Sequence, residues 1–324
     1  MFSFILMFLY FFSSAIAEEN IENLHRLWKQ KTEDELIDQV EKLHFTGQFE
    51  EAQTLLDFLL EEHFSAYVFF LWAQNSEYRK DYEIAIEAYQ DLLSGEIDPY
   101  LRMDVSYRIG IAYDDSVQPK KAIKIWSRLL KDPLLSDEYI PALQLLIGAA
   151  YIHSNQDRKG VNLITQAIEK ANRDHDWMKA RARNALAMVL IRQADEMALS
   201  GAKAQEDFSK RMEILKKAEE QVIASVHLHK TAYVLQGVIQ MVDAYLRLYD
   251  DARTIMPPTP LPIDMEDRYF DTLEKKAHNL LLLAENYAIK GAQMTRRDNW
   301  KGEETKMLAD RVMALRKEKK KRAQ

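Results

Sequence analysis

The chain has 324 residues, no cysteine and a formal net charge of −7, and 47% of its residues are hydrophobic. This length is enough to bury a sizeable core, while the lack of cysteine excludes disulfides, thiolate metal ligands and cysteine nucleophiles. The acidic balance argues against a nucleic-acid-binding protein, which would normally carry a basic face. Only 9 Gly and 8 Pro interrupt long stretches rich in Ala, Leu, Glu and Lys, and this composition predicts an all-α fold.

The chain begins with an uncharged apolar block, FSFILMFLYFF at positions 2–12, which is followed by SSAIA and then by acidic residues. An apolar stretch that ends in a small-x-small site, here Ala15 and Ala17, is typical of a secretory signal peptide. We therefore expect residues 1–17 to be a signal peptide that is cleaved after Ala17. Because the block lacks a preceding Lys or Arg, a retained membrane anchor is the alternative, although it is shorter than the roughly 20 residues of a spanning helix.

Residues 18–172 contain a pattern that recurs at intervals of 33 to 38 residues. Each copy has a small residue among apolar ones, an aromatic residue nearby, and a second small residue, which is Ala52, Ala85, Ala122 or Gly160. Small residues let two helices approach closely, and neither helix of a pair can bury its apolar stripe without its neighbours. The pattern predicts about four stacked helix pairs.

This pattern resembles the tetratricopeptide repeat (TPR), whose period is about 34 residues, and the chain as a whole resembles exported bacterial TPR proteins. The resemblance implies a right-handed α-α superhelix, a TPR-like solenoid, in which the first helix of each pair lines a concave groove for a partner protein. Carried onto this sequence, the inward-facing positions give a partner-binding groove made of Tyr67, Phe70, Gln74, Tyr78, Tyr107, Ile111, Asp114, Asp115, Leu145, Ile152 and His153.

Beyond residue 172 the pattern loosens. Residues 173–298 are expected to form an expanded helical repeat that acts as a cap, with a Pro-rich loop at 257–262 where a helix must break. After this loop, a helix is predicted from about Met265 to Gly291.

The last part of the chain, residues 299–324, is predicted to be a basic helix or tail. Residues 306–324 hold eight Lys and Arg against two acidic residues, a net charge of +6. The segment is either a solvated helix end or an electrostatic contact with an anionic membrane, a cell-wall polymer or an acidic partner. The side chains that would make this contact are Lys317, Lys319, Lys320, Lys321 and Arg322.

Motifs of catalytic or metal sites are weak throughout the sequence. The G-x-S-x-G, Gly-rich phosphate-loop and H-E-x-x-H patterns are absent. Glu41 and His44 stand at i,i+3 spacing, which favours a surface ion pair. His227 and His229 are two apart, so in a helix they point in different directions. We therefore expect no enzymatic activity, no cofactor and no metal.

Together these features predict a non-catalytic scaffold or adaptor in the cell envelope, periplasmic or at the cell surface. Its groove would bind an extended peptide or a helix of a partner protein, in the assembly of an envelope, secretion, motor or pilus complex. Nucleic acid is not expected as a partner. The alternatives are a membrane-tethered structural subunit and an accessory helical protein in cell-wall remodelling.

Overall fold

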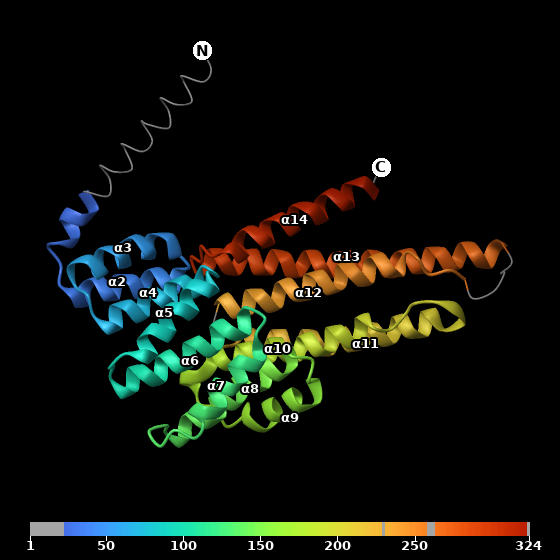
Figure 1. The fold of residues 1–324 in the computed structure, drawn as a ribbon. Helices are drawn as coiled ribbons and strands as arrows, with labels where there is room; N and C mark the ends of the chain where they lie inside the picture. Colours follow the sequence, from blue (N-terminus) through green and yellow to red (C-terminus); the bar gives the residue numbers. More distant parts are fainter. Residues whose placement is uncertain (1–22, 229–230, 258–262, 323–324) are drawn as a thin grey trace, which may run out of the picture. The chain divides into compact units, whose positions relative to one another are not determined.

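Every regular element in the described part of the chain is a helix (Figure 1), which confirms the predicted all-α class. The chain divides into two compact units, of which the first ends at Arg102 and the second begins at Met103. The computed structural model describes residues 23–228, 231–257 and 263–322.

Two of the predicted segments fall mainly beyond these ranges. The signal peptide at residues 1–17 lies outside the described residues, and so does most of the Pro-rich loop at 257–262. Within the described residues, no helix is both long enough and apolar enough to cross a membrane.

The first unit is built from two helical hairpins, which follow a short helix at residues 23–28. Its helices are α2 (Glu33–Thr46), α3 (Phe49–Glu62), α4 (Ala66–Tyr78) and α5 (Tyr82–Ser94). At its start, α2 is held by a capping box, in which Thr32 and Glu35 satisfy each other's backbone N–H groups.

The second unit continues with helical pairs and ends in longer helices. Its helices are α6 (Pro99–Asp115), which starts just ahead of the division, α7 (Pro119–Leu129), α8 (Ile140–His153), α9 (Asp157–Ala167), α10 (Asp176–Asp195), α11 (Ala204–Val226), α12 (Thr231–Ala252), α13 (Ile263–Arg297) and α14 (Glu303–Arg322). Short 3₁₀ turns precede α8, α10 and α11.

One type of turn connects the helices of each pair. A residue with left-handed backbone conformation closes the first helix, and the next N–H donates a hydrogen bond of 2.8 or 2.9 Å to the carbonyl five residues earlier. This is the Schellman arrangement, which satisfies carbonyls at a helix end. The left-handed residues are Gly47, Lys80, Val117, Asn155 and, between α13 and α14, Asn299.

These turns set the register of the predicted repeats. The second small residue of each predicted copy, namely Ala52, Ala85, Ala122 or Gly160, is buried and follows the left-handed residue by five positions. The structure therefore agrees with a helical repeat over α2–α9. The fifth turn, at Asn299, was not predicted, because the sequence there was interpreted as the start of a tail.

Glycines lie where the helices of a pair approach closely. A Cβ atom on Gly110 of α6 would lie 2.2 Å from Trp126 Nε1 on α7, and one on Gly160 of α9 would lie 2.4 Å from the carbonyl oxygen of Gly148 on α8. A larger residue would require the Trp126 ring to shift at the first crossing and the helix backbones to separate at the second. The predicted role of small residues is therefore visible in the packing.

The longer helices α10–α14 pack side by side within the second unit (Figure 1). Helix α13 runs on to Arg297, so the predicted end at Gly291 is wrong. At Gly291, a Cβ atom would lie 2.9 Å from Leu308 of α14 and 3.0 Å from Val238 of α12. The glycine therefore serves close packing within the helix and does not terminate it.

Ion pairs, of which the Arg211 guanidinium is the buried partner, link these longer helices. Arg211 of α11 is 2% exposed, and its guanidinium contacts Asp195 near the end of α10 at 3.3 Å and Asp251 of α12 at 2.8 Å. Arg311 of α14 makes a two-pronged contact with Asp243 of α12, with distances of 2.8 and 2.7 Å. A two-pronged arginine–carboxylate contact fixes the relative orientation of the two helices and also stabilises their packing.

Candidate functional site

Helix α4 is packed between its neighbours along two of its sides and is accessible along the other two. Asn75 donates to the carbonyl of Phe49 and to Gln53 on α3, while Phe70 and the Glu77 carboxylate contact Tyr89 of α5. Successive residues are 100° apart around a helix. Two stripes on opposite sides of α4 are therefore left between these packed sides.

One of the two stripes holds the residues of α4 that were predicted to line a groove. Tyr67 is 40% exposed and its ring lies 6.0 Å from that of Phe70, while Gln74 and Tyr78 are half-buried. The Tyr78 ring stacks on Phe49 at 5.2 Å. Phe70 is buried, so its predicted role as a contact residue is corrected, because its ring packs toward α5.

The opposite stripe, which the sequence analysis missed, is also aromatic. Phe64, Phe69 and Trp72 follow one another, with ring centroids 6.3 and 5.9 Å apart. Phe64 is 74% exposed, and the other two rings are half-buried. Their spacing in the sequence would have revealed the stripe, since Phe69 and Trp72 are three residues apart and lie opposite Tyr67 and Gln74.

In the second unit, the predicted groove residues on α6 lie mostly in packed positions. Ile111 and Asp114 are buried, which excludes them as direct contacts for a partner and corrects that prediction. Tyr107 is half-buried, and its hydroxyl lies 3.5 Å from Met178 Sδ. On α8, Leu145 and Ile152 are likewise buried, because they form part of the core.

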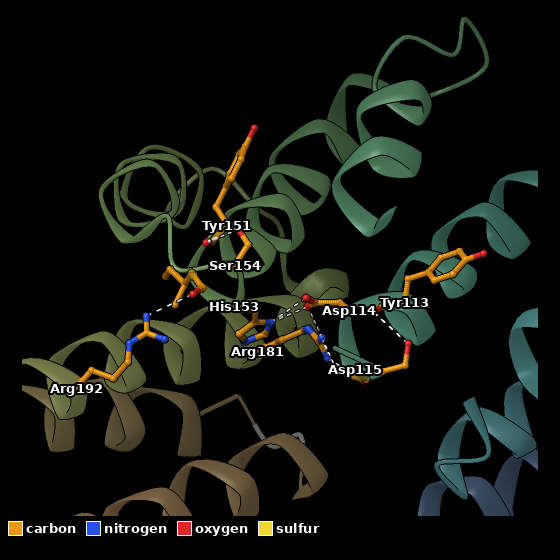
Figure 2. Close-up of polar contacts among 10 residues, drawn as sticks. Tyr113, Asp114, Asp115, Tyr151, His153, Ser154, Arg181 and Arg192 are labelled. Atoms are coloured by element: carbon orange, nitrogen blue, oxygen red, sulfur yellow. Dashed lines mark hydrogen bonds and ion pairs between the residues drawn. The ribbon is translucent and has the colours of Figure 1, made fainter. Parts of the chain in front are cut away.

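The predicted acidic residues instead form a charge cluster with Arg181 of α10 (Figure 2). Arg181 Nη2 lies 2.6 Å from Asp114 Oδ2 and 2.5 Å from Asp115 Oδ1. The Nδ1 atom of His153 on α8 lies 2.9 Å from both carboxylate oxygens of Asp114. We refer to Asp114, Asp115, His153 and Arg181 as the charge cluster.

The cluster keeps its buried groups ionised. Burial acts to raise the pKa of the Asp114 carboxyl, but Arg181 and His153 outweigh burial and hold that pKa below its ordinary value. Burial also acts to lower the pKa of Arg181, yet the carboxylates of Asp115 and Asp114 hold it well above the usual value. Asp114 is therefore a carboxylate whose charge is balanced from within the protein.

This arrangement makes the predicted groove on α6 less acidic. An acidic surface was expected there, whereas Arg181 compensates one of the two carboxylates and ties α6 to α10. The signal for Arg181 was present in the sequence. It stands three residues after Met178 and four before Ala185, both buried, and so lies on the apolar face of its helix.

Of the other histidines considered for a metal site, His44 lies within the described residues. His44 Nε2 lies 3.1 Å from Asn75 Oδ1, and the ring contacts Tyr78, whereas His229 falls outside the described residues. Within the described ranges, no group of three or more His, Cys, Asp or Glu side chains could hold a metal ion.

The predicted basic contact at the end of the chain is described only in part. Lys317 is exposed on α14. The side chains of Lys319, Lys320, Lys321 and Arg322 lie outside the described residues, so their contact with an anionic surface stays a prediction.

The fold and these surfaces define an all-α protein of adjacent packed helices, compatible with a helical repeat. Comparison with known protein families finds no family model that matches the chain, and comparison with curated proteins likewise finds no match.

Proposed function

We propose that the protein is a non-catalytic scaffold whose TPR-like helix pairs stack as a right-handed superhelix and bind a segment of a partner protein. The observation that carries this proposal is the accessible stripe on α4, where Tyr67, Gln74 and Tyr78 stand on a helix held on both sides by its neighbours. Aromatic side chains on a rigid support supply contact area at low cost in conformational entropy. Such a surface suits an extended peptide or a helix.

The proposal is tested by replacing accessible residues of the stripe. The protein is immobilised and exposed to a cell-envelope extract, and retained proteins are identified by mass spectrometry for the wild type and for Tyr67→Ala with Gln74→Ala. Tyr100→Ala is the matched control, because Tyr100 is 67% exposed and lies outside the stripe. Proteins that the control retains and the double variant loses support the proposal, whereas proteins that both variants retain contradict it.

The proposal places the protein in the cell envelope, as an adaptor in the assembly of an envelope, secretion, motor or pilus complex. The apolar block at residues 2–12 with its small-x-small site supports export. A mass of the mature chain that corresponds to a start at Glu18 would support cleavage. A mass that includes residues 1–17 would instead favour the membrane-tethered subunit.

A further inference from the structure

The stripe of α4 that lies opposite the predicted groove is a continuous row of aromatic rings. We call Phe64, Phe69 and Trp72 the aromatic ladder. The rings of Phe69 and Trp72 are stacked, with 21° between their planes. Phe64 stands in the connection between α3 and α4 and is largely exposed. The ladder therefore joins one exposed ring to two half-buried ones. Contiguous accessible apolar surface is typical of an interaction site, whereas single exposed residues are not.

The ladder is held in place before any partner arrives. Trp72 Nε1 donates a hydrogen bond of 2.9 Å to Asp57 Oδ1 on α3. The same oxygen accepts a bond of 2.7 Å from Gln53 Nε2. The indole ring is therefore oriented from within the unit, and a partner that stacks on it would not have to order this side chain.

On the side of α3, the Asp57 carboxylate contacts the ladder, and the register of the hairpin places a second carboxylate nearby. Three residues connect α3 to α4, so the two helices form an antiparallel hairpin. Since Asp57 meets Trp72, this register brings Glu61, one turn further along α3, to the level of Phe69. Glu61 is exposed.

The surrounding unit is strongly acidic. Residues 33–98 contain seventeen Asp and Glu against three Lys and Arg, a formal charge of −14, although the whole chain carries only −7. A field of this sign attracts cationic partners and repels anionic lipid and nucleic acid. The complementary partner is therefore a basic one.

Among basic side chains, arginine can contact both the aromatic rings and the carboxylates of this surface. A guanidinium plane stacks on aromatic rings and at the same time presents paired donors to a carboxylate, whereas a lysine ammonium is a compact point charge. We propose that the aromatic ladder, with Asp57 and Glu61, is a second docking surface that takes an arginine-containing basic segment of a partner protein. This second docking surface is separate from the proposed groove, because it lies on the opposite side of α4.

The test measures binding of defined peptides to the whole protein by calorimetry. The probes are an arginine-rich peptide, a lysine counterpart of equal charge, and a peptide of residues 303–324 of this chain. The variants are Phe64→Ala and Glu61→Gln, with Phe45→Ala as the matched control, because Phe45 is 76% exposed and lies on α2. Circular dichroism verifies that each variant keeps its helices.

We expect the arginine peptide to bind more tightly than the lysine peptide, and binding to weaken as salt is raised. Phe64→Ala should weaken it by about two- to fivefold, the range of an exposed cation–π contact. Glu61→Gln should also weaken it, and Phe45→Ala should leave it unchanged.

Equal binding of the arginine and lysine peptides, or of the wild type and Phe64→Ala, would overturn the proposal. Tighter binding of the 303–324 peptide would also overturn it, because the occupant would then be the protein's own basic helix. The groove on the other side of α4 is tested by Tyr67 and Gln74, so failure of one surface is distinguishable from failure of the other.

Discussion

At the scale of single residues, Arg181 is the side chain on which the buried carboxylate of Asp114 depends. The two are 2.6 Å apart, and the Asp114 side chain is fully buried. Replacement by Ala would leave a buried carboxylate with His153 as its remaining ionisable contact in the cluster. We expect Arg181→Ala to lower the free energy of unfolding of the second unit by about 3–5 kcal/mol, the usual loss when one partner of a buried pair is removed.

Urea unfolding monitored by circular dichroism measures this loss, with Arg268→Ala as the control because Arg268 is exposed on α13. The double variant Asp114→Asn with Arg181→Gln removes both charges and should recover part of the stability. If Arg181→Ala costs no more than the double variant, the ion pair is not what stabilises the packing of α6 on α10.

The backbone of Val117 has a strained conformation. Its φ is 63°, and its side chain is 85% exposed at the turn between α6 and α7. A β-branched residue is disfavoured in this left-handed region by roughly 1–2 kcal/mol, whereas glycine adopts it freely. We expect Val117→Gly to stabilise the protein by about 1 kcal/mol in thermal unfolding.

Asn155 provides the comparison, because it occupies the equivalent turn with a φ of 60°. Asparagine tolerates this conformation better than valine does. Asn155→Gly should therefore change the stability less than Val117→Gly. An equal or larger gain at Asn155 would show that strain at Val117 is not the cause.

At the scale of helices, the crossing of α8 and α9 explains a departure from the repeat pattern. The equivalent positions of the other pairs hold Ala52, Ala85 and Ala122, yet α9 has Gly160. A Cβ atom there would lie 2.4 Å from the carbonyl oxygen of Gly148 and 2.6 Å from Ile152 Cγ1. Since a backbone atom cannot move aside as a side chain can, α8 and α9 would have to separate.

We therefore expect Gly160→Ala, which restores the usual residue of the pattern, to destabilise the protein by about 1–3 kcal/mol, the cost of overpacking. Urea unfolding measures the change. Gly95→Ala is the control, because its Cβ atom would have no neighbour closer than 3.6 Å. A Gly160→Ala variant that is as stable as the control would show that the crossing relaxes freely.

The helix pairs could be predicted from the sequence because small residues recur at intervals of 33 to 38 residues, and Gly47 indicated the first turn. The left-handed turns at Lys80 and Val117 have no glycine and could not be predicted in this way. The groove was harder to predict. Phe70 and Ile111 share the helical period of the accessible positions, and only the placement of neighbouring helices decides which of them is covered. Arg181 compensates Asp114 from a helix 66 or more residues away, and no local pattern links the two.

At the scale of the whole molecule, charge is distributed unevenly along the chain. Residues 33–98 carry −14, and residues 306–324 carry +6. In the second unit, Arg181, Arg211 and Arg311 pair with Asp114, Asp115, Asp195, Asp243 and Asp251. In the first unit, by contrast, acidic residues outnumber basic ones so strongly that most of them cannot be paired within residues 33–98, and mutual repulsion opposes the compact state.

This difference predicts that added salt stabilises the first unit more than the second. The Debye length falls from about 30 Å at 0.01 M salt to about 8 Å at 0.15 M, so exposed repulsion is screened while buried pairs are affected little. Hydrogen exchange measured by mass spectrometry should show α2–α5 becoming more protected as salt is raised, by on the order of 1 kcal/mol in opening free energy. Replacing the exposed Glu51 and Glu87 by Gln should reduce this gain, and an equal gain in α6–α14 would show that repulsion within the first unit is not its source.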